Sequence, residues 1–198
     1  MELILLPLLL FSSYEDIKKR TINTLPYLTV DFLLLGIYLY LHSVLFVITI
    51  PVILEYFMKK RSYVPYVLVL IPVAFSFSAL SVSLAYSIVL IKFFKTIVKE
   101  FGTGDVKVLQ SIALAFPSYI NLPPLDSLFP PVLLVMLVAS AAGLVASLVN
   151  SHYRSAETSE DQTRFWIKGG KRSYKIPFVA FITSAYVFLL ILSSLRLV

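Results

Sequence analysis

The residues best suited to chemistry are two aspartates, Asp16 and Asp105, which lie at the ends of apolar segments. Asp105 follows Gly102-Thr103-Gly104 and opens an apolar run that extends to Ile120. Because burying a charged carboxylate is costly, an acidic residue at the mouth of an apolar helix is a candidate functional group. Glycines beside it permit positive φ angles and a close approach of another chain segment. The simplest alternative is that Asp105 only caps the following helix.

Two facing carboxylates can hydrolyse a peptide bond without a metal ion. Like charges a few ångströms apart cannot both ionise, so the pair holds one acid and one base. The base takes a proton from water, and the acid protonates the scissile carbonyl or the leaving amine. The chain has no cysteine, and its two histidines, His42 and His152, are far apart in sequence. We therefore expect Asp16 and Asp105 to form a catalytic pair that uses no metal or cofactor.

Other charged residues have simpler interpretations. Glu15 lies about 100° round a helix from the first aspartate, and we expect it to face lipid headgroups or nearby basic residues. Asp31 and Glu55 lie within apolar segments. Each could pair with a lysine, contact a basic substrate segment or bond to a neighbouring helix, and we favour a structural or substrate-contact role. Lys107 lies on nearly the opposite helix face from the second aspartate, so we expect a headgroup or substrate contact.

The composition predicts an all-α polytopic integral membrane protein with a single domain over residues 1–198. Of the 198 residues, 59% are hydrophobic and 14% charged, and the mean hydropathy is +0.88. Ordinary domains are about 45–50% apolar and about 25% charged. Lipid admits only helices or closed barrels, and continuous apolar runs favour helices. The net charge of +6 does not indicate nucleic-acid binding, because the basic residues lie between the apolar runs.

The apolar runs predict about eight transmembrane helices. They cover residues 1–14, 25–41, 44–58, two helices within 63–97 separated by a turn at Ser76–Ser83, 105–120, 132–149 and 176–195. With both termini outside, sixteen of the 17 Lys and Arg residues lie on the cytoplasmic side, as the positive-inside rule requires. Asp16 and Asp105 then lie on that side. The polar loop 150–175 is cytoplasmic too, and we expect it to contact partners or lipid.

Three ordered motifs resemble those of the type IV prepilin peptidases, including the archaeal preflagellin peptidases, which are GxGD membrane aspartyl proteases. The motifs are Asp16–Ile22, Gly102–Leu109 and Lys175–Phe181. The resemblance implies that Asp16 and Asp105 are catalytic and that Gly102, Gly104 and Lys107 support the motif or bind substrate. It also implies cleavage of N-terminal leader peptides of pilin-like or archaellin precursors at the cytoplasmic face of the cell membrane.

The sequence departs from this family in three respects. Asn23 stands where the family usually has proline, and the two aspartates are 89 residues apart, as if one helical hairpin had been inserted. The absence of cysteine removes the zinc-binding loop of many bacterial members, so we do not expect their N-methyltransferase activity. Two alternatives remain. One is a non-catalytic membrane scaffold or assembly factor of the same fold, and the other is a small transporter with Asp31, Glu55 and Asp105 as a proton relay.

Overall fold

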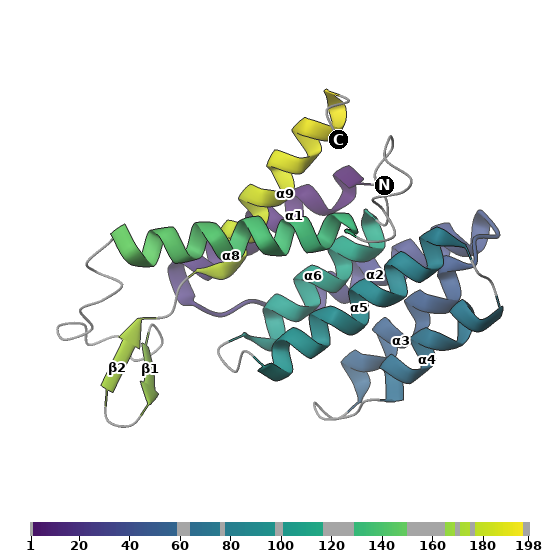
Figure 1. The fold of residues 1–198 in the computed structure, drawn as a ribbon, viewed down its shortest axis with the longest axis horizontal. Coiled ribbons are helices and arrows are strands. Elements are labelled where there is room, and N and C mark those ends of the chain that lie inside the picture. The colour runs from purple at the N-terminus through teal and green to yellow at the C-terminus, as the bar shows by residue number, and fades with distance from the viewer. Residues whose placement is uncertain are drawn as a thin grey trace.

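The computed structural model describes residues 2–58, 64–75, 78–97, 101–116, 129–149, 165–168, 171–174 and 177–195. In these residues the chain forms eight α-helices, one short 3-10 helix and one antiparallel hairpin. The predicted all-α class is therefore confirmed for the described part of the chain. The hairpin, β1 (Phe165–Lys168) and β2 (Lys171–Tyr174), was not predicted. It lies inside the expected polar loop and apart from the helices (Figure 1).

The helix boundaries follow the apolar runs closely. In order along the chain they are η1 (Glu2–Leu5), α1 (Leu6–Lys19), α2 (Leu25–Tyr40), α3 (Leu45–Phe57), α4 (Val64–Phe75), α5 (Ala79–Ile97), α6 (Thr103–Ala115), α8 (Pro131–Val149) and α9 (Phe178–Ser194). The predicted helices 25–41, 44–58, 132–149 and 176–195 differ from the observed ones by at most two residues at either end. Local signals, namely apolar runs bounded by proline, polar and basic residues, set these ends.

Three expected boundaries are wrong. The first helix does not stop near residue 14 but continues to Lys19, so Asp16 lies inside its last turn. The turn expected at Ser76–Ser83 is shorter, because α5 already begins at Ala79. Ser78 causes this early start, since its hydroxyl accepts a hydrogen bond of 3.1 Å from the Ser81 N–H and so caps the helix. The sixth helix was expected to continue to residue 120 but ends at Ala115, and the turn expected at 121–126 lies outside the described residues.

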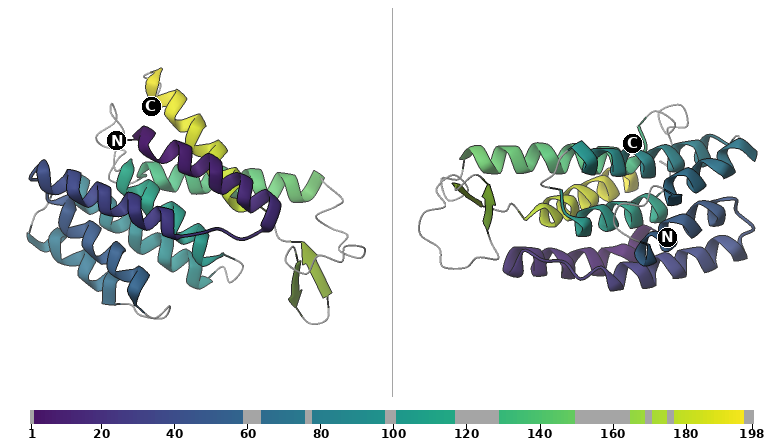
Figure 2. Two further views of the ribbon diagram at one scale, coloured as in Figure 1. Left: turned by 180° about the vertical axis from the view of Figure 1, so that it is seen from behind. Right: turned by 90° about the horizontal axis from the view of Figure 1, so that it is seen from below.

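Helix α6 is the centre of the fold. It packs against α2 and α5 on one side and against α8 and α9 on the other. Every residue of α6 from Val106 to Ala115 is buried. Figures 1 and 2 show α1, α8 and α9 grouped on one side of α6 and α2 to α5 on the other. A residue at the start of α6 is therefore placed between two groups of helices.

Helices α1 and α9 run antiparallel in close contact. The Ser13 hydroxyl donates to the Thr183 hydroxyl at 2.6 Å, and the Thr183 hydroxyl lies 3.2 Å from the Leu9 carbonyl. Nearer the other end of the pair, Asp16 contacts Val179. These polar contacts join the C-terminal end of α1 to the N-terminal end of α9, where the first candidate aspartate lies.

The interior carries many polar groups and the exterior many apolar ones. Buried polar side chains include Ser12, Asp16, Asp31, Thr49, Ser87, Lys92, Lys107, Gln110, Ser111 and Thr183. Exposed apolar side chains include Leu10, Phe11, Phe32, Leu33, Val67, Leu137, Phe188 and Ile191. Among the helices described, only α5, over Leu80–Ile97, passes as long and apolar enough to cross a membrane. The shorter apolar stretches are α2, α3, α9 and the Pro131–Ala146 part of α8.

Candidate active site

Asp16 is held by the N-terminus of α9. Its side chain is buried, and its Oδ2 accepts a hydrogen bond of 2.9 Å from the backbone N–H of Val179. Val179 is the second residue of α9 and follows Pro177 and Phe178. The first N–H groups of a helix have no partner within it and carry partial positive charge, so they bind a carboxylate well. Because α9 begins directly after Pro177, the backbone N–H of Val179 lies in its first turn, where it can donate to Asp16.

Asp105 is held in a similar way at the start of α6. It is the third residue of that helix, and its Oδ2 accepts a hydrogen bond of 2.8 Å from the backbone N–H of Gly102. Asp105 therefore makes the capping contact named in the alternative interpretation. Asp105 is half-buried, and its neighbour Thr103 is exposed. Capping and chemistry are compatible here, because the cap bond uses one carboxylate oxygen and the site reaches the surface.

The two glycines serve close packing rather than an unusual backbone. Gly102 has a φ of −68°, and no positive φ occurs at Gly104, so neither glycine uses the positive φ angles that glycine permits. A Cβ on Gly102 would lie 3.0 Å from Asp105 Oδ2, and one on Gly104 would lie 3.1 Å from Ile22 Cδ1. The expected close approach of another segment is confirmed, and that segment is the loop that follows Asp16.

Arg20 turns the chain toward this glycine. It ends α1 in the left-handed region with a φ of 54°, which is uncommon for a residue other than glycine. Its N–H donates to the Asp16 carbonyl at 3.0 Å, and its guanidinium donates to the same oxygen at 3.2 Å. This turn brings Ile22 against Gly104, so the segment after α1 contacts the start of α6.

A ring contact joins the two aspartate sites from another direction. Phe101 and Phe178 meet edge to face, with ring centroids 5.2 Å apart. Phe101 precedes Gly102, the donor to Asp105, and Phe178 precedes Val179, the donor to Asp16. The segments that carry Asp16 and Asp105 are therefore in contact with each other, and a direct pairing of the two carboxylates stays a prediction.

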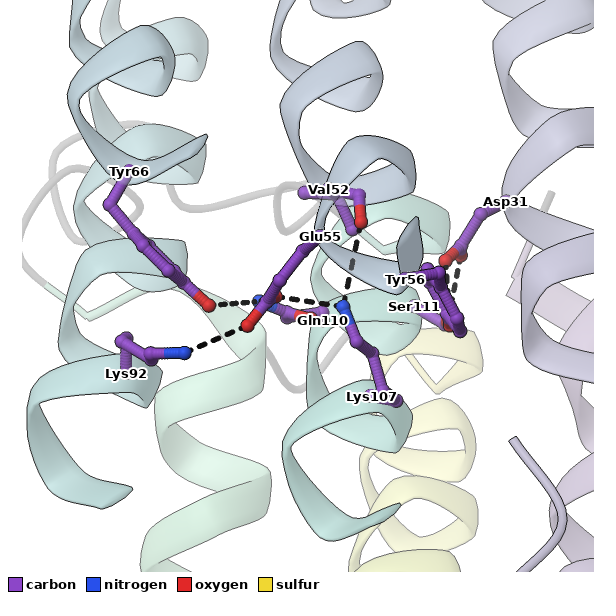
Figure 3. A network of polar contacts seen from close by, with 9 residues as sticks. All are labelled: Asp31, Val52, Glu55, Tyr56, Tyr66, Lys92, Lys107, Gln110 and Ser111. Carbon is purple, nitrogen blue, oxygen red and sulfur yellow. Dashed lines mark hydrogen bonds and ion pairs between the residues drawn. The ribbon is translucent and has the colours of Figure 1, made fainter. Parts of the chain in front are cut away.

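A second group of acidic residues lies on the other side of α6 (Figure 3). The Oε1 atom of Glu55, in α3, lies 2.8 Å from the Nζ atom of Lys92, in α5. Its Oε2 atom accepts hydrogen bonds from two side chains of α6, from Lys107 Nζ at 2.7 Å and from Gln110 Nε2 at 2.8 Å. Pairing with lysine, one of the roles considered for Glu55, is confirmed. Gln110 Nε2 also lies 3.3 Å from the hydroxyl of Tyr66, so α4 joins the same network.

Asp31 of α2 is fully buried and bonded to neighbouring helices. Its Oδ1 accepts a hydrogen bond of 2.6 Å from the Ser111 hydroxyl of α6, and its Oδ2 accepts one of 3.1 Å from the Tyr56 hydroxyl of α3. This confirms the interhelical hydrogen bond considered for Asp31. Glu15 lies 3.5 Å from Lys19, which confirms its expected contact with the basic residues at the end of α1.

The headgroup contact expected for Lys107 is wrong. Lys107 is 8% exposed, and its Nζ points to Glu55 inside the bundle. The same Nζ lies 3.5 Å from the Val52 carbonyl and 4.0 Å from the centre of the Tyr56 ring. The angular position of Lys107 relative to Asp105 was predicted correctly. The error lies in what occupies the opposite side of α6, which is protein with a buried carboxylate rather than lipid headgroups.

Sequence reasoning missed several members of the site. The Val179 N–H carries no side-chain signal, and the turn at Arg20 has no glycine to mark it. Gln110 and Ser111 could have been found, because they are polar in an apolar run and lie three and four residues after Lys107, on the same helix face. Within the described residues, no group of three or more His, Cys, Asp or Glu side chains could hold a metal ion.

Comparisons of the chain with models of known protein families, with curated proteins and with solved structures find no match. The likeness to the prepilin peptidases thus rests on the three motifs quoted above. Two of them, Asp16–Ile22 and Gly102–Leu109, meet at the Ile22–Gly104 contact. The described part of the third, which begins at Pro177, supplies the donor to Asp16.

Proposed function

We propose that this protein is a membrane-embedded aspartyl endopeptidase, similar to the type IV prepilin peptidases. It cleaves N-terminal leader peptides from pilin-like or archaellin precursors at the cytoplasmic face of the cell membrane. The observation that carries the proposal is that the segments flanking Asp16 and Asp105, which are 89 residues apart in the sequence, are in contact through Ile22 with Gly104 and through Phe178 with Phe101. Each carboxylate is anchored by a backbone N–H at the start of a helix.

In the proposed mechanism, the two carboxylates share one proton, which belongs to the pair rather than to one residue. One carboxylate takes a proton from water, and the water oxygen attacks the scissile carbonyl carbon. The other carboxyl group donates its proton to the carbonyl oxygen, which gives a tetrahedral intermediate. When the C–N bond breaks, the proton taken from water passes to the leaving amine, and the proton on the former carbonyl oxygen returns to the carboxylate that gave it. The Val179 and Gly102 N–H groups hold the carboxylates in place without needing to move. Such fixed geometry is a large part of what an active site contributes.

The membrane placement is part of the proposal. The eight described helices would cross the bilayer with both termini outside, and Asp16 and Asp105 would lie near its cytoplasmic face. The apolar exterior of the helices supports this, because monomeric soluble proteins rarely expose large apolar patches. The span-like helix α5 and the distribution of Lys and Arg support it too.

Cysteine labelling of this naturally Cys-free chain tests the topology. Lys19→Cys and His42→Cys place single thiols at exposed positions before the start and after the end of α2. A membrane-impermeant thiol reagent should reach position 42 from outside and position 19 only from the cytoplasm. Leu195→Cys, also exposed, should behave like position 42. Labelling of positions 19 and 42 from the same side would contradict the topology and the cytoplasmic active site.

Incubation of the purified protein with pilin-like and archaellin precursors tests the activity. The wild-type protein should release the leader peptide, whereas Asp16→Asn and Asp105→Asn should insert normally and leave the precursor intact. Asparagine keeps the size and the hydrogen-bonding capacity of aspartate but cannot share the proton. Cleavage by either variant at close to the wild-type rate would reject the aspartyl-protease assignment. The non-catalytic scaffold would then be the better interpretation.

The transporter alternative is less well supported by the geometry. A relay through Asp31, Glu55 and Asp105 requires these groups to exchange protons with one another. Asp31 and Glu55 are instead bonded to hydroxyl, amide and ammonium groups on the α2–α5 side of α6. Asp105 is bonded at the start of α6, where the segment after α1 and the ring of Phe178 from α9 approach.

A further inference from the structure

The face of α6 opposite Asp105 carries three polar side chains. At about 100° per residue, Lys107, Gln110 and Ser111 lie about 200°, 140° and 240° round the helix from Asp105. All three are buried. Lys107 and Gln110 bind Glu55 on α3, and Ser111 binds Asp31 on α2 (Figure 3). The helix that presents Asp105 is thus attached by its opposite face to two other helices.

Lys107 is the attachment point nearest to Asp105. It lies two residues after Asp105, in the first turns of α6. Its Nζ is fixed by the Glu55 carboxylate at 2.7 Å, with the Val52 carbonyl and the Tyr56 ring also in contact. All three contacts come from one segment of α3. Any rotation of the start of α6 would stretch the ion pair between Lys107 and Glu55.

We propose that Lys107 is a positioning residue, whose ion pair with Glu55 sets the rotation of α6 and so holds Asp105 opposite Asp16. This inference rests on the proposed peptidase function. A helix with its side chains has a radius of about 6 Å, so a rotation of about 10° moves a carboxylate oxygen by about 1 Å. A misplacement of that size lowers the rate of catalysis by up to about a hundredfold.

Lys92 offers a matched control. It binds the same Glu55 carboxylate at 2.8 Å and is 8% exposed, like Lys107. It belongs to α5, however, and not to the helix that carries Asp105. Lys107→Met and Lys92→Met each remove one of the two ammonium groups on Glu55 and keep a long apolar side chain. The two variants differ in whether α6 or α5 is released.

Kinetics of precursor cleavage separate the two roles. Lys107→Met should lower kcat by about ten- to a hundredfold with little change in KM, because a misplaced Asp105 impairs chemistry and not binding. Lys92→Met should have a kcat close to that of the wild type. This should hold even if both variants lower the unfolding temperature by the same amount. An unchanged kcat in Lys107→Met would overturn the inference. A fall of kcat in both variants in step with stability would also overturn it.

A crosslinking readout does not depend on activity. In the Cys-free chain, the double variant Asp16→Cys/Asp105→Cys is treated with a short thiol-specific crosslinker. Crosslinking should be efficient in this background, remain so with Lys92→Met added, and fall with Lys107→Met added. That result supports the positioning role even if no precursor is cleaved. Absence of cleavage would then count against the peptidase function alone. Unchanged crosslinking with Lys107→Met, together with inactive Asp16→Asn and Asp105→Asn variants, would reject the positioning role and leave the peptidase function intact.

Discussion

Acidic residues on the two sides of α6 have different bonding partners. Toward α1 and α9, Asp16 and Asp105 accept hydrogen bonds from backbone N–H groups at helix starts. Toward α2 to α5, Glu55 is neutralised by two lysines, and Asp31 is bound by two hydroxyls. Both sides lie within or beside apolar helices. An acidic residue in such a helix is therefore an insufficient guide to chemistry, and its bonding partners decide its role.

Bonding partners decide the role of a carboxylate because they change the free-energy difference between its charged and protonated forms. A carboxylate between two ammonium groups is strongly held in its charged form, which makes it a poor proton donor or acceptor. Two carboxylates that face each other destabilise the doubly charged state, so one of them readily keeps a proton. Backbone N–H groups orient such a pair but carry no full charge that would remove this effect. The α1 and α9 side thus favours acid–base chemistry, and the α2 to α5 side favours helix packing.

The sharpest test of this contrast compares the double variant Asp16→Asn/Asp105→Asn with Asp31→Asn. Each single Asn variant of the pair should lower single-turnover cleavage by roughly three orders of magnitude or more. The double variant should be no worse than either single one, because residues that act as a unit are not additive. Asp31→Asn should retain much of the activity. An additive loss in the double variant would indicate that the two aspartates act independently.

On the other side of α6, the largest effect is on stability. Glu55→Gln leaves two buried lysines without a countercharge, and the free energy of unfolding should fall by about 3–5 kcal/mol. Denaturant unfolding in detergent micelles measures this. Glu15→Gln is the control, because its ion pair with Lys19 is longer and the lysine is exposed, so a change below about 1 kcal/mol is expected. Equal losses in the two variants would contradict the structural role given to Glu55.

The glycine contact between the two aspartate sites should show an intermediate effect. Gly104→Ala places a methyl group 3.1–3.2 Å from Ile22 atoms, so the segment after α1 must shift. We expect the free energy of unfolding to fall by about 1–3 kcal/mol. We also expect the cleavage rate of the folded protein to fall, because the shifted segment lies next to both aspartates. Gly36→Ala in α2 is the control, because nothing lies within 4 Å of the added methyl. It should be neutral or stabilise the helix by up to about 1 kcal/mol, and activity should be unchanged.

The smallest expected effect concerns the attachment of α9. Thr183→Val removes a buried hydroxyl that contacts Ser13 and the Leu9 carbonyl across the helix pair. The unfolding free energy should fall by about 1 kcal/mol. Ser184→Ala removes an exposed hydroxyl that bonds only to the Ala180 carbonyl of its own helix, among the contacts described. Its effect should be close to zero, and a larger loss than for Thr183→Val would argue against the α1–α9 contact.

Much of the fold was accessible from the sequence because the signals are local. Apolar runs, prolines and basic clusters predicted α2, α3, α8 and α9 to within one or two residues. The same pattern predicted that Asp16 and Asp105 lie on one side of the helices, and in the structure the segments that flank them are in contact. The spacing along α6 predicted that Lys107 points away from Asp105. These inferences need only the helical period and the distribution of charge along the chain.

Only the tertiary structure decided what each face meets. In helices that are apolar almost all round, the pattern does not say which side packs on protein and which is exposed. The ion pair of Lys107 with Glu55, the donation from Val179 to Asp16 and the packing of Ile22 on Gly104 each join segments far apart in the chain. Backbone donors carry no side-chain signal, and a buried ion pair depends on the rotation of two helices. The sequence by itself determined the helices and the ends at which charges gather, and packing determined their partners.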